Sequence, residues 1–310
     1  MRLSETEAKI TSVERVHRTM LLPSEASSQL GNLASPPKEW PSRGELHFDN
    51  VCMHYREGLP LVLKNVSFRV PAGSRCGVIG RTGSGKTSLA NVLFRLVELM
   101  SGRILLDGLD LSQLGLSDVR GRPNGMRMIP QDPVLFAGTV RECLDPFGLE
   151  NDDRILEALQ AVGHKGASDR DVAILDDPVE EGGRNYSVGQ RQLLCLARAI
   201  VEEPRVLVLD EATACIDTES DTCIQEMLRA RFQDTTLLTI AHRLHTIMDY
   251  DFVIVMDDGK CVEFGSPKDL LENDQGLFST LVGASFDNVS DLRRIASQTK
   301  STKHSNKLKS

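Results

Sequence analysis

Residues 75–97 read RCGVIGRTGSGKTSLANVLFRLV, and this stretch decides the fold. Its first six residues form a short apolar run that predicts a buried strand, and SLANVLFRLV has the apolar spacing of a helix. Between them, Gly80–Thr87 matches the pattern G-x-x-x-x-G-K-[ST] of a P-loop. The glycines let backbone N–H groups converge on a phosphate, and the helix that follows directs its positive end at the same anion. The sequence therefore predicts a nucleotide site in an α/β fold.

Each position of this loop has an expected role. Lys86 is expected to neutralise charge on the β- and γ-phosphates, and the Thr87 hydroxyl is expected to bind Mg²⁺. The other residues predicted to bind the nucleotide here are Gly80, Arg81, Thr82, Gly83, Ser84, Gly85 and Ser88.

Two adjacent acids end a second buried strand, RVLVLD at 205–210, which Glu211 follows. Because the chain turns at a strand end, both carboxylates can reach a cleft there. Asp210 is expected to hold Mg²⁺, mainly through a water, and Glu211 to orient and polarise the attacking water. His242 ends a third apolar run, TTLLTIAH at 235–242, so we expect it near the γ-phosphate. For the other histidines we expect structural roles.

Tyr55 follows the strand-like stretch LHFDNVCMHY and precedes the P-loop. An aromatic ring at this place could stack on a nucleobase. Spacing alone leaves core packing as an equally good interpretation.

Composition limits the class of protein. The 310 residues include 36 basic and 44 acidic side chains, and this net charge of -8 argues against general nucleic-acid binding. The seven cysteines are scattered and never spaced as C-x-x-C, which favours buried thiols in a reducing compartment. No apolar run of about 18 residues occurs, and the start is not a signal peptide. Any membrane role is therefore expected to come through a partner.

The composition also divides the chain into three parts. Residues 1–43 are expected to form a short amphipathic helix and a linker, and 44–285 one α/β domain. Inside that domain, Asp258-Gly259 predicts the turn of a hairpin, and Ser266 the N-cap of a helix. Residues 286–310 are basic and are expected to be a disordered tail, with contact to anionic lipid as the alternative.

The segment Asn185–Gln192, NYSVGQRQ, resembles the signature motif of the ABC transporter family. P-loop, signature segment, Asp-Glu strand end and strand-terminal His occur in the order typical of that family. Gln131, in MIPQDP, resembles its glutamine loop, 214–217 its D-loop and Tyr55 its aromatic A-loop. HYREGLPLVLKNVSF and LTIAHRLHTIMDYD are similar to the C-terminal nucleotide-binding domain of the multidrug-resistance-associated (C) subfamily.

The resemblance implies a P-loop NTPase core with a mostly parallel sheet, an antiparallel β subdomain and an inserted α-helical subdomain at about 132–200. It implies that ATP and Mg²⁺ bind, that Glu211, His242 and Gln131 act in hydrolysis, and that Gln131 joins Thr87 and Asp210 at the metal. Ser187, Gly189 and Gln190 would contact ATP bound to another domain. Val188 stands where the motif usually has glycine, which puts the strength of that contact in doubt.

The function implied is ATP hydrolysis that powers export of an unidentified substrate. The partners would be a second ABC domain, expected to be the N-terminal one of a full transporter, and transmembrane domains, with no nucleic acid. The chain would lie at the cytoplasmic face of a plasma or organelle membrane, peripheral to it unless fused to spans. A soluble ABC ATPase that regulates a non-transport complex is the alternative; an ATP-gated domain without catalysis is disfavoured, because no catalytic position is degenerate. GTP is not expected, because N-K-x-D is absent.

Overall fold

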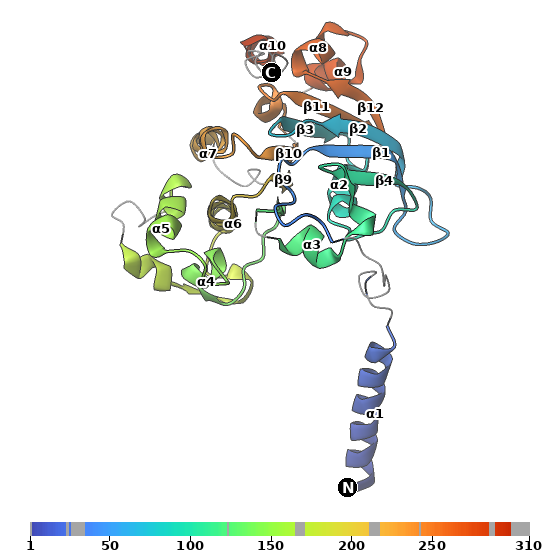
Figure 1. Ribbon diagram of the computed structural model, residues 1–310, viewed down its shortest axis with the longest axis vertical. Coiled ribbons are helices and arrows are strands. Elements are labelled where there is room, and N and C mark those ends of the chain that lie inside the picture. The colour runs from blue at the N-terminus through green and yellow to red at the C-terminus, as the bar shows by residue number, and fades with distance from the viewer. Residues whose placement is uncertain are drawn as a thin grey trace. The chain divides into compact units, whose positions relative to one another are not determined.

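We describe the chain from a computed structural model (Figure 1). The structure describes residues 2–22, 25, 35–122, 124–164, 171–210, 218–241, 243–284 and 289–298. The chain divides into two compact units, Met1–Ser35 and Pro36–Ser310. The first unit contains the expected helix, α1 (Arg2–Met20), whose apolar residues Ile10, Val13, Val16 and Met20 are all exposed.

A six-stranded sheet with the order β12-β11-β3-β10-β9-β6 forms the centre of the second unit. Its strands are β3 (Arg75–Gly80), β6 (Met126–Ile129), β9 (Val206–Asp210), β10 (Thr236–Ile240), β11 (Phe252–Asp257) and β12 (Lys260–Gly265). All neighbouring pairs are parallel except β11 and β12, which form the hairpin that Asp258-Gly259 predicted. Both turn residues have positive φ.

A second sheet is antiparallel, with the order β2-β1-β4-β5. Its strands are β1 (Leu46–Met53), β2 (Leu63–Val70), β4 (Ser101–Leu106) and β5 (Leu109–Asp110). Helix α2 (Lys86–Leu93) packs its buried residues in one cluster with residues of both sheets (Figure 1). The expected combination of a mostly parallel sheet and an antiparallel β subdomain is confirmed.

The side chains of strand β9 contribute to two hydrophobic cores, one on each face of the central sheet. Val206 and Val208 belong to the core shared with the antiparallel sheet, whereas Leu207 and Leu209 belong to the core on the other face. Because successive strand residues point to opposite faces, the near-continuous apolar run at 205–210 is what a sheet covered on both sides requires.

Helices contribute most of the second core. The segment expected to form the helical subdomain contains α4 (Val140–Leu144), α5 (Asp152–Ala161) and α6 (Val188–Glu202), which Figure 1 shows on one side of the domain. Short elements between them are β7 (Gly138–Thr139), β8 (Pro178–Val179), η4 (Val172–Asp176) and η5 (Glu181–Gly183). The other described helices of this unit are η2 (Leu111–Gln113), α3 (Leu116–Gly121), α7 (Thr218–Arg231), η6 (Leu244–Ile247), α8 (Pro267–Glu272), α9 (Leu277–Ala284) and α10 (Val289–Gln298).

Part of the expected linker belongs to the domain. The second unit begins at Pro36, earlier than the boundary at 44 that composition suggested. Trp40 is buried, and its indole N–H donates to the carbonyl oxygen of Leu106 at 3.0 Å. The Asp107 carboxylate then accepts the backbone N–H groups of residues 42–45 at 2.8 to 3.1 Å. These long-range bonds hold a stretch that looks like a linker because it is rich in Pro and Ser.

The expectation of a disordered tail from residue 286 is wrong for Val289–Gln298, which form α10. Leu292 and Ala296 are buried, and Ile295 packs against the same core. Their spacing of i, i+3 and i+4 gives one apolar face to an otherwise polar helix. The basic side chains that suggested disorder lie outside that face, as the ion pair of Arg293 with Asp274 at 3.3 Å shows.

None of the helices in the described ranges has an apolar stretch long enough to cross a bilayer.

Candidate nucleotide site

Three parts of the predicted site, the P-loop, Asp210 and Gln131, lie at the same edge of the central sheet. Strands β3, β10, β9 and β6 are parallel neighbours, so their carboxyl ends lie together. The P-loop (Gly80–Thr87) follows β3, Asp210 ends β9, and Gln131 comes two residues after β6. This is the edge at which open α/β sheets bind ligands.

The P-loop forms a tight turn between β3 and α2. Gly83 and Gly85 have φ values of 82° and 100°, which side chains with a Cβ rarely adopt. Lys86 begins α2 and is only 6% exposed. Its ammonium donates to the carbonyl oxygens of Gly80 at 2.9 Å and Arg81 at 3.1 Å. The lysine is therefore folded across its own loop, where a phosphate group would meet it.

The loop is fastened from outside by the β11–β12 turn. Gly259 donates its N–H to the carbonyl oxygen of Ser84 at 3.1 Å and accepts the N–H of Lys64 at 2.8 Å. A Cβ on Gly259 would overlap the carbonyl oxygen of Val62, and one on Gly80 would overlap that of Met256. Glycine is required at both places because backbones approach too closely for a side chain.

The residues present fit a phosphate group. The hydroxyl oxygen of Ser84 is buried, with no hydrogen-bond partner among the described atoms. A buried polar atom left unpaired costs about 1–3 kcal/mol, so a native structure normally supplies it with a partner. Phosphate oxygens cradled by the loop would be such a partner. Arg81 and Thr82 are exposed on the same turn.

The proposed metal ligands also fit Mg²⁺, which prefers hydroxyl, carboxylate and amide oxygens together with phosphate oxygens. Thr87 is exposed at the loop, Gln131 is exposed beyond β6, and Asp210 is 6% exposed at the end of β9. The described residues contain no group of three or more His, Cys, Asp or Glu able to hold a metal on their own.

Tyr55 lies beside the P-loop helix. Its hydroxyl is 2.9 Å from the Ser88 hydroxyl oxygen and accepts a hydrogen bond from the Asn91 amide at 3.2 Å. The side chain is partly exposed, at 47% for the residue, which leaves ring surface available for stacking. Sequence reasoning missed Asn91. Its spacing of three residues from Ser88, on one helix face, is the signal that could have found it.

The signature segment begins α6. The Ser187 hydroxyl accepts the Gln190 N–H at 3.2 Å, and the Gln190 side chain accepts the Ser187 N–H at 2.8 Å. These two bonds form a capping box, which leaves Ser187 and Gly189 at a helix N-terminus where an anion is favoured. Gln190 thus stabilises the N-terminus of α6 as part of the capping box.

Two predicted catalytic residues, Glu211 and His242, lie outside the described residues, as does the segment 214–217. Their expected roles stay predictions. The flanking geometry is described: Asp210 pairs with Ile240, and Ala241 donates its N–H to the Val78 carbonyl oxygen at 3.1 Å.

Of the cysteines whose side chains the structure describes, two are buried and three are partly buried. Cys76 on β3 is fully buried, and burial raises the pKa of its thiol far above the ordinary value. Burial also raises the pKa of Cys261 to about 11 and that of Cys195 to about 11. Because thiolates are the reactive form, a raised pKa lowers the reactive fraction of each of these thiols at neutral pH. The expected buried thiols are confirmed at Cys52 and Cys76.

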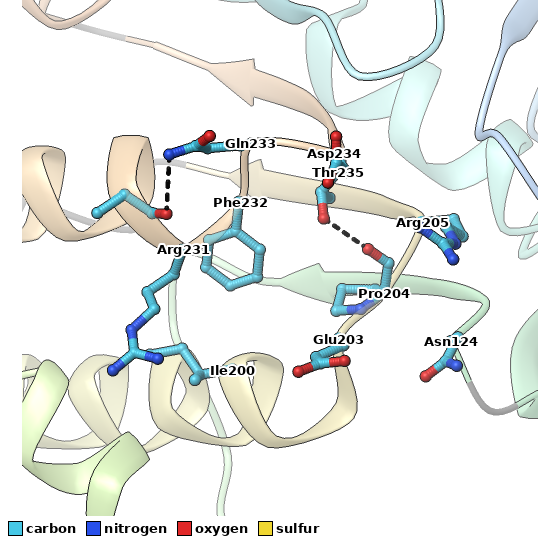
Figure 2. Close-up of a pocket in the computed structure, with 11 residues that line it drawn as sticks. Asn124, Ile200, Glu203, Pro204, Arg205, Arg231, Phe232, Gln233, Asp234 and Thr235 are labelled. Atoms are coloured by element: carbon cyan, nitrogen blue, oxygen red, sulfur yellow. Dashed lines mark hydrogen bonds between the residues drawn. The ribbon is translucent and has the colours of Figure 1, made fainter.

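A pocket of about 490 Å³ opens at the opposite edge of the sheet (Figure 2). Arg205 and Thr235, which line it, directly precede β9 and β10, so it faces the amino ends of these strands. Figure 2 shows Thr235 bonded to the Pro204 carbonyl oxygen, at 2.8 Å, with Glu203 and Arg231 around the opening. The P-loop, Asp210 and Gln131 lie at the carboxyl ends, so this pocket is not the nucleotide site.

The chain is similar to known proteins over most of its length. The profile of the ABC transporter family matches residues 63–214. ABC transporter C family member 3 of Dictyostelium discoideum is 46% identical over 96% of this chain and 21% of its own length. ATP-binding cassette sub-family C member 2 of Rattus norvegicus is 44% identical over 92% of this chain and 18% of its own length. The chain thus spans about a fifth of the length of these relatives.

A solved structure of an ABC exporter is also similar to this chain. A bacterial Atm1-family ABC exporter with ATP bound superposes with a TM-score of 0.75 and 32% identity, over 84% of this chain and 46% of that chain. The match confirms the P-loop NTPase fold that the family resemblance implied. The chain belongs to the ABC transporter family, and its second compact unit is the ATP-binding domain of that family.

Proposed function

We propose that the chain binds and hydrolyses Mg-ATP and thereby powers export through transmembrane domains, in the manner of the C subfamily. The observation that carries this proposal is the meeting of three parts at one sheet edge: the P-loop, Asp210 and Gln131. The Dictyostelium relative is named as an ABC transporter, the rat relative is named as an ATP-binding cassette protein, and the similar solved structure is an exporter with ATP bound.

The chain's residues divide the work. Lys86 and the P-loop N–H groups hold the β- and γ-phosphates, and Tyr55 stacks on the base. Thr87, Asp210 and Gln131 would hold the metal, and the metal would supply positive charge to offset the charge on the phosphates. Glu211 positions and polarises the attacking water, and His242 contacts the γ-phosphate.

The assembly proposed for hydrolysis contains two domains. Ser187 and Gly189 stand at a helix N-terminus, and they would contact the γ-phosphate of ATP held by a second ABC domain. Val188 in place of glycine weakens that contact. The chain would then act at the cytoplasmic face of a membrane. A soluble ATPase that regulates another complex is the second candidate, but no particular contact in the structure favours it.

The first experiment is ATP binding by the purified chain. Lys86→Ala should abolish high-affinity binding, because the phosphates lose the one lysine of the loop. Lys260→Ala, an exposed lysine on β12, is the matched control and should bind normally. Equal ATP affinity in the two variants would show that the P-loop does not bind the nucleotide.

The second experiment addresses hydrolysis and assembly. Glu211→Gln keeps the size of the side chain but cannot act as a carboxylate base, so phosphate release should fall by about 10²–10⁴. Bound ATP should persist and hold two domains together, which size-exclusion chromatography with and without Mg-ATP would detect. If Glu211→Gln hydrolysed ATP at the wild-type rate, Glu211 would not be the catalytic base. Reconstitution with transmembrane partners, and loss of export in the same variant, would separate transport from the soluble alternative.

A further inference from the structure

Side chains from the first turn of α6 hold the glutamine loop, Gln131–Pro133. The Arg191 guanidinium donates to the carbonyl oxygen of Pro133 at 3.0 Å and to the carboxylate of Asp132 at 3.0 Å. The Gln192 amide donates to the carbonyl oxygen of Gln131 at 3.2 Å. Three consecutive loop residues are thus each bonded to one of two neighbouring residues about 60 positions later in the chain.

Both anchoring side chains are shielded from water. Gln192 is fully buried, although it is a polar residue. The oxygen of the same amide is buried, with no hydrogen-bond partner among the described atoms. The Arg191 side chain is 16% exposed, against 79% for that of Asp132. The bonds to Pro133 and Gln131 are partly buried, whereas the bond to Asp132 is exposed, so the first two are expected to contribute most to holding the loop.

Arg191 also reaches the start of the signature segment. Its guanidinium donates to the carbonyl oxygen of Tyr186 at 3.2 Å, directly before Ser187. The capping box fixes Ser187 on the same helix end. One guanidinium therefore bridges the backbone before Ser187 and the loop that carries Gln131.

We propose that Arg191 and Gln192 are positioning residues for Gln131. They touch neither nucleotide nor metal; they hold the backbone of the glutamine loop so that the exposed Gln131 side chain lies at the edge where Asp210 ends β9. This inference rests on the proposed function, in which Gln131 binds the metal that accompanies ATP. Since Ser187 begins the same helix, a movement of α6 reaches Gln131 through these two side chains.

The test measures ATP affinity of the full chain with Mg²⁺ and with EDTA. Arg191→Ala and Gln192→Met each remove donors to the loop, so the affinity gained from Mg²⁺ should fall about five- to tenfold, the equivalent of one or two hydrogen bonds. Affinity in EDTA should stay the same, because the P-loop is untouched. Arg198→Ala is the matched control: Arg198 lies farther along α6 and pairs with Glu202 at 3.1 Å.

A double-mutant cycle separates positioning from a general structural role. Once Gln131→Ala has removed the side chain, Gln192→Met should change the Mg²⁺-dependent affinity no further. Arg191→Lys, which keeps the charge but not the fork of donors, should show an intermediate loss and keeps the test valid if Gln192→Met fails to fold. Thermal melting of each variant records stability separately.

Two results would overturn the inference: an equal loss of affinity with and without Mg²⁺, or effects of Gln131→Ala and Gln192→Met that add. A wild-type chain that binds no ATP at all would instead overturn the proposed function. The two failures are therefore distinguishable in one set of measurements.

Discussion

Replacing Gly259 by alanine tests the contact between the β11–β12 turn and the P-loop. Gly259 has a φ of 76°, and the left-handed conformation costs a residue with a Cβ about 1–2 kcal/mol. The new Cβ would overlap the Val62 carbonyl oxygen, so the turn must move. That movement strains the two backbone bonds of Gly259, to Ser84 and Lys64, each worth about 1 kcal/mol. We expect a total loss of about 3–4 kcal/mol in the free energy of unfolding, measured by urea titration.

Gly58→Ala is the matched control. Gly58 has a φ of 83°, but a Cβ there would meet nothing within 4 Å. In Gly58→Ala the free energy of unfolding should fall only by the conformational cost of about 1–2 kcal/mol. Gly259→Ala should also weaken ATP binding about fivefold, the equivalent of the lost bond to Ser84, whereas Gly58→Ala should not. If the two variants matched in both stability and affinity, the turn would not support the P-loop and the reasoning would fail.

Three further predictions concern other contacts. Asp107→Asn should lower the free energy of unfolding by about 1–3 kcal/mol in urea titration, because one amide oxygen cannot accept all the N–H groups of residues 42–45; no change would refute the role of that carboxylate. Tyr55→Ala should weaken ATP binding by about 1–3 kcal/mol, because the stacking ring is lost. Tyr55→Phe and Asn91→Ala should have small and similar effects on the affinity. A large loss of affinity in Tyr55→Phe, measured by calorimetry, would mean that the hydroxyl matters and the ring does not. Burial raises the pKa of Tyr250 to about 12 from 10.0. The neutral phenol is therefore favoured in the folded state, and its contribution to the free energy of unfolding should be constant below pH 10 and fall by about 2–3 kcal/mol as the pH rises to 12. Tyr250→Phe should remove this part of the pH dependence of urea unfolding.

Local patterns predicted the elements that position the phosphate loop. The apolar run RCGVIG coincides with β3, the Asp258-Gly259 turn lies where the hairpin turns, and Ser266 caps α8 through the Asp269 N–H at 3.1 Å. Each signal depends on neighbours within a few residues, where backbone preference and turn chemistry decide the conformation. The antiparallel β subdomain was expected from the family resemblance rather than from these patterns, and the order of strands was not predicted.

Contacts between distant segments could not be predicted in the same way. Nothing near Gln192 in the sequence indicates a bond to Gln131, and nothing near Trp40 indicates one to Leu106, because the folded sheet brings these pairs together. The helix α10 was missed for another reason. Its charged residues dominate the composition, and the small apolar face of Leu292, Ile295 and Ala296 gains its stability only from the core that receives it.

The attachment of residues 36–45 has a mechanical consequence. Trp40 and Asp107 join this segment to the end of β4, and β1 begins directly after it and leads to Tyr55. A force applied from the amino-terminal side would load these bonds before it reached β1. The antiparallel sheet would carry the tension, and the Tyr55 ring, which we propose stacks on the nucleobase, would bear no load until the anchor gave way. In a single-molecule pulling experiment, the first rupture would therefore release the anchor and leave the nucleotide pocket intact.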